Sequence, residues 1–188
     1  MSNQVQPATE RRGGSVRILG AEYYRRPATE LAPDVVGKVL CRKIGDDVIR
    51  LRITETECYF GEEDTACHAH RGKTSRTGIL YATGGYAYVY LCYGMHNLLN
   101  LVTGEEGHPE AILLRGVEGS MGPGRLTRAL GIDRSLNQKL LIPENGLWLE
   151  DDGYRPASLL TAPRIGIGYA APEDRERLWR FTDACVGK

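Results

Sequence analysis

The chain has 188 residues, of which 41% are hydrophobic and 26% are charged, and its 24 basic residues balance its 24 acidic residues. These values are ordinary for a globular protein of one domain, or at most two, with a real core. Zero net charge excludes a surface coated in basic charge, although a local basic groove remains compatible with it.

Two further compositional features narrow the class. The five cysteines are odd in number and scattered along the chain, which is typical of reduced thiols and not of a disulfide framework. No run of eighteen apolar residues occurs, and the N-terminus lacks the charged-then-apolar pattern of a signal peptide. We therefore expect a cytoplasmic protein, associated with the nucleoid in a bacterium, with no membrane partner.

Residues 1–15 are polar and include Gly13-Gly14, so we expect a flexible tail followed by one domain over residues 16–188. In chain order, we expect a helix that Thr29 caps over 29–36, strands over 38–44 and 48–59 joined by a hairpin turn, an aromatic hairpin over 86–102, a strand over 111–117, a helix over 123–130, and short strands over 147–149 and 164–169. Many strands, few helices and hairpin-type links predict an α+β fold. It is a single domain with a mainly antiparallel curved β-sheet core, surrounding short helices and a protruding β-hairpin.

The strand over 48–59 places two carboxylates at the end of an apolar face. Alternation predicts that Ile53, Glu55 and Glu57 share one face, which puts the carboxylates at the edge of the core. A general base needs one ionised carboxylate beside a water, and an arginine such as Arg115 can keep it ionised. The same pattern is also typical of ordinary solvated side chains on a strand.

The stretch Gly84–Asn100, which holds most of the expected aromatic hairpin, carries Tyr86, Tyr88 and Tyr90 on one strand face and Tyr93 at the tip. Half of the ten tyrosines lie between Tyr81 and Tyr93, and no acidic residue occurs between residues 71 and 102. Such a platform suits stacking on a nucleobase, and it equally suits tyrosines that merely form a strand with one wet edge.

Other motifs give weaker indications. Cys67, His68 and His70 form half of a possible metal site, but His96 and His108 are isolated, so we expect no metal. Walker, dinucleotide-binding and GxSxG patterns are absent. The segment Gly122–Arg125 suits a phosphate at a helix start, or is an ordinary capped helix start.

Several different short motifs, made of acidic, aromatic, basic and glycine residues, follow one another along the chain. They lie at Glu55–Asp64, His68, Arg71–Thr74, Tyr86–Tyr90, Tyr93–His96, Asn100, Leu113–Arg115, Gly122–Thr127 and Arg164–Ile167. In this order and spacing the chain resembles the alkyladenine (3-methyladenine) DNA glycosylase family, and most closely its compact bacterial-type members. The resemblance extends from about Leu19 to Phe181.

The resemblance implies a monofunctional DNA glycosylase of base excision repair. Such an enzyme flips alkylated or deaminated purines out of damaged double-stranded DNA and hydrolyses the N-glycosidic bond with an activated water. The purines are of the 3-methyladenine, 7-methylguanine, hypoxanthine and ethenoadenine class, and no cofactor is implied. We expect the protein to act as a monomer.

Site roles follow from the same resemblance, position by position. The catalytic group comprises Glu57 as general base, with Arg115 and the backbone carbonyl of Ile167 holding the water. Base-pocket positions are Tyr59, His68, Tyr90 and Asn100, and Tyr93 is the wedge that fills the gap in the duplex. We expect the DNA backbone to contact Arg71, Lys73, Arg76, Met95, His96 and Arg125.

Several departures leave the substrate range open. Cys58 and Cys67 replace commoner small apolar residues, Ser75 stands where proline is usual, and the match at His70 is loose. Two other functions stay in view: a non-catalytic nucleic-acid-binding module that uses the tyrosine hairpin, and a small-molecule hydrolase that keeps Glu57 without needing Tyr93.

Overall fold

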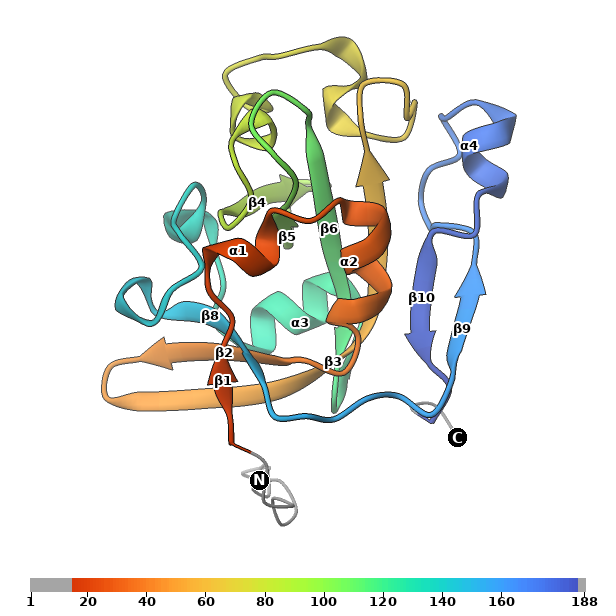
Figure 1. The fold of residues 1–188 in the computed structure, drawn as a ribbon. Coiled ribbons are helices and arrows are strands. Elements are labelled where there is room, and N and C mark those ends of the chain that lie inside the picture. The colour runs from red at the N-terminus through yellow and green to blue at the C-terminus, as the bar shows by residue number, and fades with distance from the viewer. Residues whose placement is uncertain (1–14, 186–188) are drawn as a thin grey trace.

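The computed structural model describes residues 15–185, and these form ten strands, four α-helices and four short 3-10 helices around one curved sheet (Figure 1). The strands are β1 Arg17–Ile18, β2 Val39–Ile44, β3 Asp47–Phe60, β4 Ala87–Cys92, β5 His96–Val102, β6 Glu110–Val117, β7 Ser120–Met121, β8 Leu147–Asp151, β9 Leu159–Ala162 and β10 Arg180–Asp183. The helices are α1 Ala21–Tyr24, α2 Ala28–Val35, α3 Pro123–Ala129 and α4 Pro172–Glu176, with 3-10 turns η1 His68–Arg71, η2 Gly78–Tyr81, η3 Arg134–Leu136 and η4 Pro143–Asn145.

The sheet is antiparallel along the path β1-β8-β2-β3-β6-β5-β4, with β10 and β9 added beside β3. Strand β3 is central, because its first half pairs with β2 and its second half pairs with β6 and β10. Figure 1 shows β3 running along the bottom of the molecule and then bending upward. The predicted α+β fold with a curved antiparallel sheet and short helices is confirmed.

A β-bulge in β3 changes which residues of this strand share a face. The register against β6 shifts between Ile53 and Glu55 and again between Glu55 and Thr56. Ile53 and Cys58 both lie in the main core although they are an odd number of residues apart, so the bulge reverses the alternation. The prediction that Ile53 shares a face with Glu55 and Glu57 is therefore wrong, because the bulge turns the carboxylates away from the main core.

Helix α2 covers the core face of β3 and β6, and its buried residues Ala28, Leu31, Ala32 and Val35 follow helical spacing. It begins one residue before the expected start, and Thr29 does not cap it. Instead, the buried Glu110 of β6 accepts a hydrogen bond from the Ala28 N–H at 2.6 Å. An N-terminal N–H of the helix is thus satisfied from across the fold, which no local pattern indicates.

The expected strand over 164–169 is wrong, because this segment is a loop. Its backbone groups serve other partners: the Ile165 N–H donates to Glu57, and Gly166 turns the chain at φ +80°. The C-terminal strands are β9 and β10 on either side of this loop, and the sequence patterns did not predict them. The expected flexible tail, residues 1–15, lies outside the described residues except for Ser15.

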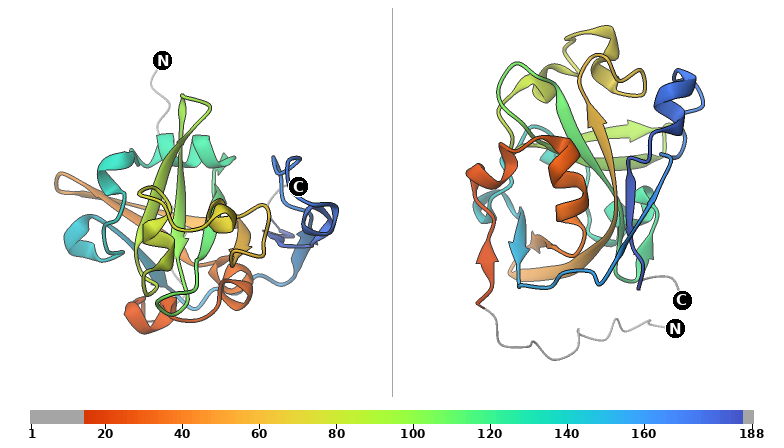
Figure 2. Two further views of the ribbon diagram at one scale, coloured as in Figure 1. Left: turned by 90° about the horizontal axis from the view of Figure 1, so that it is seen from above. Right: turned by 45° about the vertical axis from the view of Figure 1, so that its right-hand side comes forward.

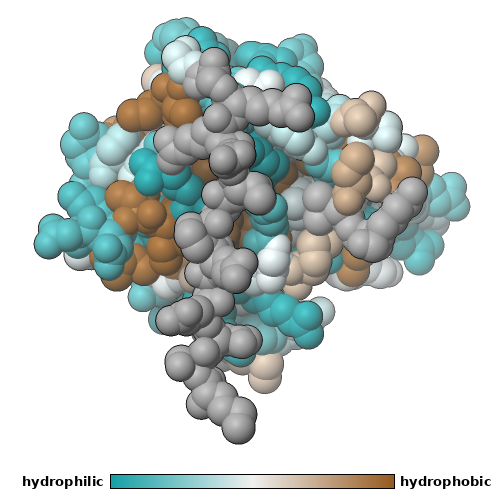
Figure 3. Space-filling view, turned by 90° about the horizontal axis from the view of Figure 1, so that it is seen from below, coloured by the Kyte–Doolittle hydropathy of each residue, from teal (hydrophilic) through white to brown (hydrophobic). Residues whose placement is uncertain are grey.

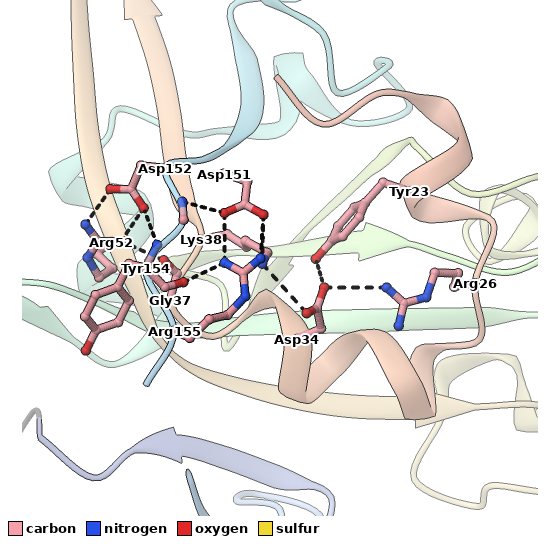
Figure 4. Close-up of polar contacts among 11 residues, drawn as sticks. Tyr23, Arg26, Asp34, Gly37, Lys38, Arg52, Asp151, Asp152, Tyr154 and Arg155 are labelled. Carbon is pink, nitrogen blue, oxygen red and sulfur yellow. Dashed lines mark hydrogen bonds and ion pairs between the residues drawn. The ribbon is translucent and has the colours of Figure 1, made fainter. Parts of the chain in front are cut away.

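A charged cluster joins α2, β8 and the segments that follow each of them (Figure 4). Lys38 is only 1% exposed, and its Nζ lies 3.2 Å from Asp151 and 3.7 Å from Asp34. Arg155 donates to both carboxylate oxygens of Asp151 at 2.9 Å. The underside of the molecule, where β1 and the β2–β3 hairpin lie, shows small apolar groups separated by polar ones in its visible part (Figure 3).

Candidate active site

Glu57 is a fully buried carboxylate on β3, and three groups surround it. Its Oε1 accepts a hydrogen bond from the Ile165 N–H at 2.8 Å, and its Oε2 accepts one from the Tyr59 hydroxyl at 2.9 Å. Tyr59 is two residues further along the same strand, so both side chains project from one face. The Nε of Arg115, on the neighbouring strand β6, lies 3.4 Å from Glu57 Oε1.

Arg115 is shared between two carboxylates. Its Nε lies 3.6 Å from Glu55 Oε1 as well, and Glu55 also pairs with Arg180 of β10 at 2.8 Å. The Nε of Arg115 is buried without an aligned hydrogen bond. Carboxylates and guanidinium groups thus alternate across β3, β6 and β10, and the charge of Arg115 acts on Glu55 as well as on Glu57.

Burial raises the pKa of Glu57 above its ordinary value, while the Arg115 charge, the Ile165 N–H and the Tyr59 hydroxyl each act to lower that pKa. A buried carboxylate with a raised pKa is a better base than a solvated one, and its hydrogen bonds fix its orientation. The arrangement is suited to removing a proton from a water molecule.

A cavity of about 350 Å³, including its open mouth, lies beside this carboxylate. Its lining residues are Tyr59, Ala66, Cys67, His68, Leu80, Tyr88, Tyr90, Asn100, Ala111 and Tyr169. All four predicted pocket residues are among them. The aromatic rings lie close together, since the His68 and Tyr90 ring centroids are 4.6 Å apart and those of Tyr88 and Tyr90 are 5.4 Å apart.

His68 is neutral at physiological pH, because burial and then the Arg76 charge lower its pKa to about 4. The Tyr88 hydroxyl accepts a hydrogen bond from Arg76 Nε at 3.1 Å and lies 3.0 Å from His68 Nδ1. Arg76 Nη2 also lies 3.4 Å from both His68 Nδ1 and His68 Nε2, so Arg76 and Tyr88 together hold the neutral ring in place. A neutral imidazole adds no positive charge to the pocket wall.

The β4–β5 hairpin ends in an exposed aromatic tip. Tyr93 is 85% exposed and Met95 is 70% exposed. Tyr93 and Gly94 have φ angles of 49° and 69°, and the Met95 N–H donates to the Cys92 carbonyl, as in a type I′ turn. Figure 2 shows the hairpin extending beyond the body in the view from above. Leu91 alternates in phase with the buried Ala87 and Val89, yet it is 42% exposed because it lies near this tip.

The residues expected to contact the DNA backbone differ in how exposed they are. Arg71, Lys73 and Arg125 are exposed, and so is Arg76, whose guanidinium also lies 5.1 Å from the Tyr90 ring centroid. His96 is half-buried against the start of α3, where a Cβ on Gly124 would lie 2.9 Å from the imidazole. Arg76 is thus joined to the pocket, and His96 joins the hairpin to the helix that carries Arg125.

The loop 163–171 contributes more than the sequence predicted. The Ile167 carbonyl accepts from the Ala170 N–H at 2.9 Å, which leaves it one further acceptor position. Arg164 is buried, pairs with Asp64, and lies 4.8 Å from the Tyr59 ring centroid. Ile165 and Tyr169 were also missed: the first acts through its backbone, and the second has no periodic neighbours in the sequence.

Within residues 15–185, no three or more His, Cys, Asp or Glu side chains form a metal-binding group. The five cysteines are all free. None of the described helices is long and apolar enough to cross a membrane.

The amino-acid sequence of the chain is similar to those of known proteins. The family model for methylpurine-DNA glycosylase matches residues 22–121 and 118–185. A candidate 3-methyladenine DNA glycosylase of Psychrobacter cryohalolentis is 43% identical over 194 aligned residues, covering 87% of this chain and 91% of the relative. Similarly named proteins of Methanocella arvoryzae and Nitrosococcus oceani are 41% and 42% identical, and the alignments cover 91% and 87% of this chain and 96% and 89% of the relatives.

The protein is therefore a DNA glycosylase, a hydrolase of damaged DNA that acts in base excision repair. The chain belongs to the methylpurine-DNA glycosylase family. This membership confirms the predicted resemblance and supports an enzyme over a non-catalytic binding module.

Proposed function

We propose that this enzyme is a monofunctional glycosylase that extrudes an alkylated or deaminated purine into the aromatic pocket and hydrolyses its N-glycosidic bond with a water that Glu57 activates. Its substrates are purines of the 3-methyladenine, 7-methylguanine, hypoxanthine and ethenoadenine class in duplex DNA. It acts as a monomer.

One observation carries this proposal: Tyr59 both lines the pocket and hydrogen-bonds the buried Glu57. A base that stacks on Tyr59 therefore places its sugar near the carboxylate. Cleavage passes through an oxocarbenium-like sugar, so a carboxylate beside that sugar stabilises the developing positive charge as well as accepting the proton of the water. Arg115 and the Ile167 carbonyl hold the water in this mechanism.

Extrusion of the base is the step that the hairpin serves. Unstacking and unpairing a nucleotide costs a few kcal/mol. Tyr93 fills the vacated space, and the pocket rings restack the extruded base, each contributing about 1–3 kcal/mol. His68 and Asn100 then distinguish the bases, Asn100 by disfavouring the amino group of guanine.

Hydrolysis by water requires no covalent intermediate. Of the five lysines, Lys38, Lys43, Lys73 and Lys139 lie within the part of the chain that the structure describes, and none of these four lines the pocket. An N-alkylated purine carries positive charge and leaves readily, so activation of water is sufficient. We therefore expect free base as the product, with no nicking of the strand.

The test is single-turnover excision from duplexes that carry each lesion, by the wild type and by Glu57→Gln. The amide keeps the shape of the carboxylate but takes no proton, so we expect the rate to fall by about 10²–10⁴-fold while lesion binding survives. Glu63→Gln is the matched control, because the Glu63 side chain is 62% exposed and lies four residues beyond Tyr59.

Three outcomes would contradict the proposal. Excision by Glu57→Gln within a few-fold of the wild type would remove Glu57 from catalysis. A covalent enzyme–DNA adduct trapped by borohydride would replace the water with a protein nucleophile. Hydrolysis of free nucleosides without activity on DNA would instead support a small-molecule hydrolase.

A further inference from the structure

Tyr169 is a large aromatic residue at the mouth of the pocket with no role in the mechanism above. It lines the cavity, yet it is 69% exposed, whereas Tyr88 of β4, which also lines the cavity, is 2% exposed. A mostly exposed ring that borders a cavity is surface that a bound ligand can cover.

The ring of Tyr169 is fixed in place. Its hydroxyl donates to the backbone carbonyl of Ala66 at 3.0 Å, and Ala66 is itself a pocket residue. The same two loops are joined again where the Ala171 N–H donates to Thr65 Oγ1 at 2.8 Å. Because these contacts hold the ring between the two loops, its distance from Tyr59 and Tyr90 does not depend on a free rotamer.

Tyr169 also lies on the loop that supplies the Ile165 N–H to Glu57. The pocket wall and the support of the carboxylate that we propose as general base therefore belong to one loop.

We infer that Tyr169 is a specificity-determining residue: its ring forms the outer wall of the base pocket and sets the width available to an extruded purine. The inference rests on the proposed function, since it concerns the same pocket. Small purines such as hypoxanthine touch this wall only if the ring is present. A purine enlarged by a fused etheno ring extends further across the pocket, so its rate of excision falls less when the Tyr169 ring is removed.

The experiment compares Tyr169→Ala and Tyr169→Phe with the wild type in single-turnover excision of hypoxanthine and ethenoadenine. We expect Tyr169→Ala to shift the ratio of the two rates toward ethenoadenine by about 5-fold or more, because stacking on one ring contributes about 1–3 kcal/mol, or 5- to 150-fold. Tyr169→Phe keeps the ring and loses the bond to Ala66, so a smaller shift in the same direction is expected. A ratio within twofold of the wild type, or equal losses on both lesions, would overturn the inference.

Binding of the two free bases is the second measurement, and it does not require catalysis. Ethenoadenine binding is followed by its own fluorescence, and hypoxanthine is measured by competition. Tyr169→Ala should weaken hypoxanthine at least 5-fold and ethenoadenine no more than 2-fold. If the wild type binds both bases but excises neither, the proposed function is contradicted and the inference about Tyr169 stands. If the wild type binds neither base, the proposed function and the inference are both overturned.

Discussion

At the scale of single residues, the hydroxyl of Tyr59 is one of the groups that lower the pKa of Glu57, after the Arg115 charge and the Ile165 N–H. It donates to Glu57 Oε2 and so favours the ionised carboxylate, which lowers the pKa of Glu57 against the effect of burial. The ring of the same residue lines the pocket. The two roles can be separated, because a phenylalanine keeps the ring and loses only the hydrogen bond.

We expect Tyr59→Phe to move the acidic limb of the pH–rate profile to higher pH. Without the donor, the pKa of Glu57 rises further, and the ionised base is lost at a higher pH as the solution is acidified. Above that limb the rate should stay close to that of the wild type.

The measurement is single-turnover excision of one lesion between pH 5 and pH 9. Tyr90→Phe serves as the control, because Tyr90 also lines the pocket but does not bond Glu57. An acidic limb that stays in place for Tyr59→Phe would show that the hydroxyl does not act on the base.

At the scale of elements, the proposed function assigns extrusion of the base to the β4–β5 hairpin and bond cleavage to the pocket. Tyr93 sits at its tip with a left-handed backbone, which costs a residue other than glycine about 1–2 kcal/mol. Its exposed ring makes no contribution to the core. A strained and exposed aromatic residue is consistent with a function outside the folded domain.

We expect Tyr93→Phe to be nearly silent and Tyr93→Ser to reduce the flipped population by about 5- to 150-fold through the loss of stacking. The loss should shrink for lesions opposite a mismatch, where less unpairing energy is required. A fluorescent base analogue beside the lesion reports extrusion, and the melting temperature should not change. A large drop in melting temperature with normal extrusion would make Tyr93 a structural residue instead.

The same element shows how far sequence patterns reach. Tyr86, Tyr88 and Tyr90 could be assigned to one face because period-two alternation is local, and the structure bears this out. Strand β10 could not be found, because it is four residues long and pairs with β3 about 125 residues away. The bulge in β3 was also hidden, since an extra residue leaves no signature in an alternating pattern. Ile165 acts through a backbone N–H, which every residue but proline carries.

At the scale of the whole molecule, the charged cluster around Lys38 makes stability depend on pH. The hydrogen bonds from Arg155, followed by the Gly153 N–H and Lys38, hold the pKa of Asp151 below its ordinary value. The ionised carboxylate therefore stabilises the fold above the unfolded pKa of about 3.9, and this contribution is lost as the pH falls through the folded value. As the pH falls below about 4, the junction of α2 with β8 should therefore weaken progressively (Figure 4).

We expect Asp151→Asn to lower the free energy of unfolding at pH 7 by about 2 kcal/mol, because it leaves the buried Lys38 with only the longer contact to Asp34. Lys38→Met is the control: it removes the buried charge, while Asp151 keeps Arg155, so the loss should be smaller. Urea unfolding at pH 7 and pH 3 measures both, and the difference between the wild type and Asp151→Asn should narrow at pH 3. Equal losses at the two pH values would show that this carboxylate does not contribute to the acid sensitivity.

The long sequence separation within the active site has a consequence for the protein as it is being synthesised. Glu57 acquires its Ile165 donor from 108 residues later in the chain, and Glu55 acquires Arg180 from 125 residues later. At about 5–20 residues per second, a ribosome needs roughly 5–20 s to supply that donor after Glu57 has been added. By the end of this interval the chain contains the hairpin and every pocket-lining residue except Tyr169, but it still lacks the group that orients Glu57. On the proposed function, a product that ends before residue 165 should therefore bind DNA without excising a base, and excision should become possible only once the loop 163–171 and β10 have joined β3.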